Sequence, residues 1–130
     1  MEILPAIGYQ ELVDFICEKQ GYFTFLHTTN SIEKALSICK NGFRFQKFDK
    51  TSDFVCDSVT VAFMLSIRKQ YGDFTVIIQI STHITHYESI SKKEYDEEGE
   101  ELFILPPQYI KGHYNRITNE IFQNPLFNKY

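Results

Sequence analysis

The sequence predicts an α+β fold, with about three helices around a mixed or mainly antiparallel sheet that is split into two packed halves. Two observations lead to this prediction. Aromatic residues are abundant, with 12 Phe and 8 Tyr among 130 residues, and these side chains favour strands and fill cores. Segments with helical and with strand periodicity also alternate along the chain. We expect a single domain over residues 1–130, because this length suits one domain and no linker or repeat interrupts it.

The first and third helices are expected at residues 9–19 and 58–70. In the first, apolar residues recur at the i, i+3, i+4 and i+7 positions of one helical face. The third begins at a cap formed by Asp57 or Ser58 and ends at Tyr71-Gly72. Each helix should therefore cover the sheet with one apolar side.

The second helix is expected at residues 31–41, where both ends are signalled. Asn30 and Glu33 have the spacing of a capping box. Asn41-Gly42 supplies the left-handed stop that commonly ends a helix. The buried side of this helix should consist of Ile32, Ala35, Leu36 and Cys39.

The strands are expected at residues 22–26, 43–45, 74–80, 102–105 and 109–117. The segment 74–80 is the strongest of them, because most of its residues are β-branched. Pro106-Pro107 interrupts the sheet, and we expect the strand that follows to be an outer one. Residues 49–57 and 81–100 are polar and predict loops, and the C-terminal tail is expected to hold one short helix.

Composition and charge exclude several classes of protein. The net charge of −4 argues against a protein held on nucleic acid by bulk electrostatics. No apolar run approaches the roughly 20 residues of a membrane helix, and Met1-Glu2 is not followed by a basic signal region. The three cysteines form no C-x-x-C pair, which favours free thiols in a reducing compartment. We therefore expect a cytoplasmic protein without disulfides and without a membrane span.

The most informative feature is an order of short motifs. Leu26-His27-Thr28-Thr29 closes the first expected strand, and a helix that ends in Asn-Gly follows. Much later, Glu100-Glu101 opens the strand 102–105. In this order, the sequence resembles the ADP-ribosyltransferase-like fold in its histidine–aromatic–glutamate branch, over about residues 22–117.

The resemblance implies an NAD-consuming transferase, of the kind found in toxins and effectors, with NAD as co-substrate and no metal. It implies that Glu101 is the catalytic residue, which binds a ribose hydroxyl and opposes the positive charge that develops on the sugar. His27 would bind the other ribose, and Thr28 and Thr29 would help to orient the dinucleotide. Phe54 would stack on nicotinamide, although the family usually has Tyr there, and Phe63 is a second candidate.

Alternatives remain open at this point. The acceptor is a protein, a nucleic acid or a small molecule, and Glu100 is the alternative position for the glutamate. A second interpretation is a non-catalytic binding module that keeps the same fold, and a third is a structural or immunity-type partner protein. His83 and His86 have a spacing that suits one metal, but zinc needs three or four ligands, so we expect no metal site.

Overall fold

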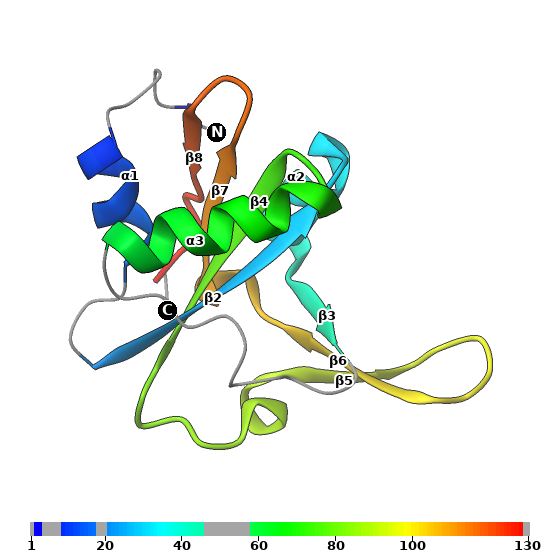
Figure 1. Ribbon diagram of the computed structural model, residues 1–130. Coiled ribbons are helices and arrows are strands. Elements are labelled where there is room, and N and C mark those ends of the chain that lie inside the picture. The colour runs from blue at the N-terminus through cyan, green and yellow to red at the C-terminus, as the bar shows by residue number, and fades with distance from the viewer. Residues whose placement is uncertain (1, 4–8, 18–20, 46–57, 129–130) are drawn as a thin grey trace.

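The computed structural model of the chain describes residues 2–3, 9–17, 21–45 and 58–128, and it confirms the α+β class (Figure 1). The α-helices are α1 (Tyr9–Ile16), α2 (Ile32–Asn41) and α3 (Ser58–Arg68). A 3-10 turn, η1 (Lys69–Tyr71), continues α3. The described strands form two separate sheets in which every pair is antiparallel, so the sheet is split as expected.

The larger sheet has five strands. Their spatial order is β1 (Glu2–Ile3), β8 (Glu120–Gln123), β7 (Ile110–Asn115), β4 (Phe74–Ser81) and β2 (Tyr22–Thr29). The smaller sheet has the order β3 (Phe43–Phe45), β6 (Glu101–Leu105) and β5 (Lys92–Tyr95). The strand β2 is thus an edge of the larger sheet, and β3 is an edge of the smaller one.

The larger sheet is covered on both faces. On one face, α1 and α3 pack against Leu26, Ile77, Tyr114 and Ile121 of the strands. On the other face, α2 and the smaller sheet pack against Phe25, Val76, Ile78 and Phe122. Figure 1 shows α3 running across β2 and β4, while the hairpin of β5 and β6 projects away from the body of the domain. The two sheets therefore share one core, and the hairpin extends beyond it.

The second helix begins and ends through local contacts. Its N-cap is Ser31 and not Asn30, because the Ser31 hydroxyl accepts a hydrogen bond from the Lys34 amide at 3.3 Å. Gly42 ends the helix with a φ of +103°, which confirms the positive φ expected of a glycine stop. A Cβ atom at Gly42 would lie 2.2 Å from the Leu105 carbonyl oxygen, so the turn also brings α2 close to β6. Ile32 is exposed and does not belong to the buried side.

Several expectations from the sequence are wrong. The first helix ends at Ile16 and not at residue 19. The first strand begins at Tyr22 as expected but continues past residue 26 and ends at Thr29. Residues 81–100 contain a strand, β5, and a 3-10 turn, η2 (Tyr87–Ile90). The tail forms β8 in place of a helix, and β7 lies inside the larger sheet although we expected an outer strand. The interruption at the prolines is confirmed, since η3 (Pro107–Tyr109) separates β6 from β7.

Candidate functional site

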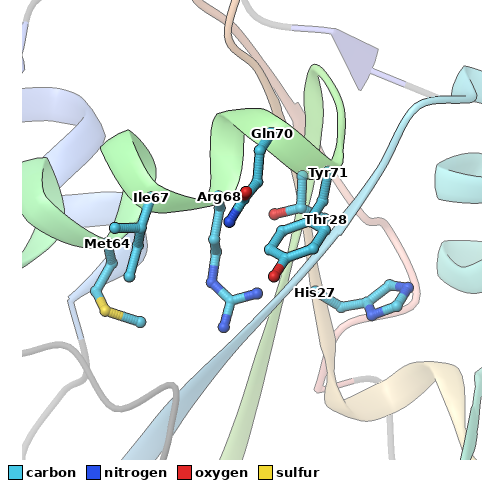
Figure 2. A pocket seen from close by; sticks show the side chains of 7 residues that line it. All are labelled: His27, Thr28, Met64, Ile67, Arg68, Gln70 and Tyr71. Carbon is cyan, nitrogen blue, oxygen red and sulfur yellow. The ribbon is translucent and has the colours of Figure 1, made fainter.

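A cavity of about 450 Å³ opens between α3 and the outer edge of β2. The described residues that line it are His27, Thr28, Met64, Ile67, Arg68, Gln70 and Tyr71 (Figure 2). Successive residues of a strand face opposite sides, so His27 and Thr28 reach the cavity from the two faces of β2. This is possible because β2 is an edge strand. The cavity therefore lies beside the split between the two sheets.

His27 lies where the edges of the two sheets meet. Its ring contacts the ring of Phe43 on β3, with the centroids 4.9 Å apart. Burial lowers the pKa of His27 below 6.5, and the positive charge of Arg68 lowers it further. The imidazole is therefore mainly neutral at pH 7, with one nitrogen that donates a hydrogen bond and one that accepts. A neutral ring of this kind suits a sugar hydroxyl, which can also donate and accept.

Arg68 and Tyr71 come from the end of α3 and from η1. Figure 2 shows both side chains extending from this end of the helix toward β2. Burial lowers the pKa of Arg68, and the neighbouring Tyr71 opposes this shift, but an arginine stays charged at neutral pH. The cavity thus combines a cation with an aromatic ring, and none of its described lining residues is acidic.

Gly72 explains how this end of α3 can approach β2 so closely. Its φ is +144°, and a Cβ atom there would lie 2.2 Å from the Thr29 carbonyl oxygen. Only glycine accepts this backbone conformation and this contact without strain. The sequence Tyr71-Gly72, which predicted only a helix stop, therefore also positions the Tyr71 ring at the cavity.

The two threonines of the His-Thr-Thr motif have different surroundings. The Thr28 hydroxyl lines the cavity and lies 3.0 Å from the Thr75 hydroxyl on β4. Thr29 is buried, and its hydroxyl accepts a hydrogen bond from the Ser31 amide at 3.4 Å, just before α2. Of the two, only Thr28 is among the described lining residues of the cavity.

Glu101 lies at the start of β6, on the smaller sheet. Its carboxylate forms an ion pair with Lys93 of β5 at 2.8 Å, and this contact raises the pKa of Lys93. Alternation places Glu101 on the same face as Phe103 and Leu105, which pack into the core. Glu100 lies in the turn before the strand, where its amide donates to Asp96. Glu101 is not among the described residues that line the cavity beside His27.

The aromatic residue at the cavity differs from the two candidates that the sequence suggested. Phe54 lies outside the described residues. Phe63 is 63% exposed on α3 and is not among the lining residues. Tyr71 takes this place, together with Arg68, and neither side chain was among the site residues expected from the sequence. Their position one turn apart, just before the strongest strand, is the signal that could have indicated them.

Other candidate chemistry is not assembled in the described part of the chain. His83 and His86 are exposed, and no three His, Cys, Asp or Glu side chains among the described residues gather as metal ligands. Cys39 is a buried free thiol, and burial raises its pKa to about 12, so this thiol is unreactive. Cys56 lies outside the described residues.

Within the described ranges, no helix is both long enough and apolar enough to cross a membrane. Comparison with protein-family models, with curated proteins and with solved structures found no match for this chain.

Proposed function

We propose that the chain is an ADP-ribosyltransferase-like domain that binds NAD at the cavity beside His27. The observation that supports this function best is the composition of the cavity, whose described lining residues include His27, Arg68 and Tyr71. Clefts with apolar walls and a few convergent polar groups are the usual sites for small ligands. The order of His27 and Glu101 along the chain supports the same function, although the two residues lie on strands of different sheets.

Several of the lining groups suit a part of the dinucleotide. Arg68 suits the pyrophosphate, because a guanidinium donates paired hydrogen bonds to phosphate oxygens. The Tyr71 ring offers an aromatic face for the nicotinamide or the adenine. The neutral His27 ring suits a ribose hydroxyl, and Thr28 adds a further hydroxyl on the other side of β2. Met64 and Ile67 supply the apolar wall.

The proposed reaction breaks the bond between nicotinamide and carbon C1′ of the ribose. The electron pair of this bond leaves with nicotinamide, and the sugar gains oxocarbenium character. A nucleophile of the acceptor then bonds to C1′ and loses its proton to water. The Glu101 carboxylate would oppose the positive charge on the sugar, which is the role that carboxylates have in glycoside hydrolysis.

One observation favours a second candidate, a non-catalytic binding module with the same fold. Glu101 is half exposed, it pairs with Lys93, and it is not among the described lining residues of the cavity. A carboxylate in this position contributes to turnover only if it reaches the ribose of bound NAD. Binding and turnover therefore have to be measured separately.

The test is calorimetric titration of the full chain with NAD, together with chromatographic detection of released nicotinamide in the presence of protein, RNA and small-molecule acceptors. We expect Arg68→Met to weaken NAD binding by at least about tenfold, since a charge-assisted pair contributes that much. Arg44→Met is the matched control, because Arg44 lies on the smaller sheet and pairs with Glu94.

Turnover is tested with the two adjacent glutamates. We expect Glu101→Gln to slow nicotinamide release by about 10²-fold, as the loss of one electrostatic stabiliser does, with little change in NAD affinity. Glu100→Gln should release nicotinamide at the normal rate. Tight NAD binding without release from any acceptor mixture would establish the binding module, and absence of NAD binding would exclude both candidates.

A further inference from the structure

A short connection joins η1 to β4 beside the cavity. Tyr71 is the last residue of η1 and Phe74 is the first of β4, so only Gly72 and Asp73 lie between them. The Tyr71 side chain lines the cavity but is 61% exposed, so packing does little to hold its ring. The place of this ring therefore depends on how firmly the two connecting residues are held.

On one side, the connection lies against the end of β2. A Cβ atom at Gly72 would lie 2.2 Å from the Thr29 carbonyl oxygen. The Gly72 amide also donates a hydrogen bond to the Lys69 carbonyl of η1 at 3.3 Å. The contact with Thr29 stops the connection from moving toward β2 but not from moving away, so a restraint is needed on the other side.

On the other side, Arg116 contacts Asp73 through both its backbone and its side chain. The Arg116 amide donates a hydrogen bond to the Asp73 carbonyl at 2.8 Å, and the guanidinium forms an ion pair with the Asp73 carboxylate. The two residues lie just beyond Phe74 and Asn115, which pair across β4 and β7. Their bonds therefore extend the antiparallel pairing and attach the connection to the turn between β7 and β8.

This turn is held by side chains of its own. The Asn115 carboxamide oxygen accepts a hydrogen bond from the Ile117 amide at 2.9 Å. The hydroxyl of the buried Tyr114 donates to the Asn119 carboxamide oxygen at 2.6 Å. Arg116 lies between these two contacts in the chain, so it reaches Asp73 from a fixed position.

The ion pair is too exposed to matter for the fold as a whole. Both side chains are 41% exposed, and exposed pairs contribute little to global stability. A pair that attaches a short connection to a fixed turn instead limits local motion, which does not require unfolding of the domain. The expected signature of Arg116 is therefore a local change at Tyr71 without a change in melting temperature.

We propose that Arg116 is a positioning residue, which acts through Asp73 to keep the Tyr71 ring at the cavity. A ring that is already in place loses less freedom when a ligand stacks on it, so preorganisation strengthens binding. This proposal deepens the proposed function and rests on it for the effect on NAD. The position of Tyr71 can also be measured in the free chain, without NAD.

The first measurement uses a single fluorophore. The chain contains no Trp, so Tyr71→Trp places one indole at this position. Its fluorescence anisotropy should fall when Arg116→Met is added, because the indole then moves more freely. Arg116→Lys should restore part of the anisotropy, since its charge can still pair with Asp73. Arg44→Met is the matched control, because it removes another exposed ion pair, with Glu94, and should leave the anisotropy unchanged.

The second measurement is titration of the chain that keeps Tyr71 with NAD. Arg116→Met should weaken NAD binding about fivefold, which corresponds to about 1 kcal/mol, the upper end for an exposed pair. Asp73→Ala should weaken binding to the same extent. The double variant should bind no more weakly than either single variant, because Arg116 acts through Asp73. The melting temperatures of all these variants should match that of the wild-type chain.

The proposal is overturned if the anisotropy at position 71 is the same with and without Arg116→Met, or falls equally with Arg44→Met. A lower melting temperature that accompanies the fall would also overturn it, since Arg116 would then have a general structural role. So would a wild-type chain that binds NAD no more tightly than Arg116→Met. If the wild-type chain does not bind NAD at all, the proposed function fails, and the anisotropy of the free chain alone decides the role of Arg116.

Discussion

The two sheets differ in how much of their surface the rest of the chain covers. In the larger sheet, β4 is buried from Thr75 to Ile80, because helices cover one face and α2 with the smaller sheet covers the other. In the smaller sheet, only the face that carries Phe45, Phe103 and Leu105 packs into the core. Its hairpin is largely exposed, and β5 has no buried residue.

This difference separates the two residues that carry the family resemblance. His27 lies on the larger sheet, in contact with Phe43 and beside the cavity. Glu101 lies on the hairpin, where its main contact is an exposed ion pair with Lys93. Local stability in proteins follows burial and packing. His27, which we propose to bind NAD, therefore lies on the more buried sheet. Glu101, which we propose to act in turnover, lies on the more exposed one.

The largest decrease in the free energy of unfolding is expected for a substitution in the centre of the larger sheet. Ile77 is 0% exposed on β4, so Ile77→Ala should lower the free energy of unfolding by about 3 kcal/mol, through lost burial and a remaining cavity. Ile104 lies on the outer face of β6 and is only partly buried. Ile104→Ala should cost less than about 1.5 kcal/mol in the same denaturant titration. Equal losses would contradict the difference between the sheets.

The next effect concerns acid stability of the larger sheet. His113 is 4% exposed on β7, and both ring nitrogens lack hydrogen-bond partners in the described part of the chain. Its ring contacts the rings of Phe74 and Phe122, and burial lowers its pKa to about 4. Below pH 6.5 the unfolded chain takes up a proton that the folded chain refuses, so stability is complete above pH 6.5 and falls toward pH 4.

The loss assigned to His113 over this range is about 3 kcal/mol. We expect His113→Leu to remove that part of the pH dependence when unfolding is measured from pH 7 to pH 4. The exposed His83 is the control, and His83→Asn should keep the slope of the wild-type chain. A slope that persists in His113→Leu would show that other groups cause the acid sensitivity.

A smaller decrease in the free energy of unfolding is expected for a substitution where α2 joins the smaller sheet. Gly42 has a positive φ, and a Cβ atom at this position would clash with the Leu105 carbonyl oxygen. Gly42→Val should lower the free energy of unfolding by at least about 1 kcal/mol, because a β-branched residue resists this backbone region. Gly99 also has a positive φ but has open space around its Cβ position, so Gly99→Val is the control that separates backbone strain from the contact with Leu105. Thermal denaturation of both variants gives the comparison.

The smallest effect is expected on the hairpin. Lys93→Met removes the ion pair with Glu101, and exposed pairs of this kind contribute little to stability. The melting temperature should stay unchanged, whereas a clear decrease would mean that the hairpin contributes more to the fold than its exposure indicates. If Glu101 acts in turnover, nicotinamide release by Lys93→Met should change although the melting temperature does not.

Local signals in the sequence were sufficient for the elements with clear ends or strong periodicity. The stop at Gly42, the three helices and the β-branched strand 74–80 were predictable, because glycine, capping residues and apolar spacing act within a few residues. The strand β8 was not, since Ile121 and Phe122 are both buried, on opposite faces, and do not alternate with polar residues. The strand β7 follows Pro106-Pro107, which predicted an outer position, yet its residues Gly112 and His113 are buried.

For the candidate site, the sequence by itself determined the motif residues His27, Thr28 and Glu101 and the family that they resemble. Only the tertiary structure decided which of them meet. The cavity exists because α3 crosses the edge of β2, and it adds Arg68 and Tyr71, which lie 40 or more residues after His27 in the chain. The tertiary structure also placed Glu101 on the smaller sheet, where it pairs with Lys93, and not on the sheet that carries His27. Contacts of this kind depend on packing between distant segments, and no local pattern of residues records them.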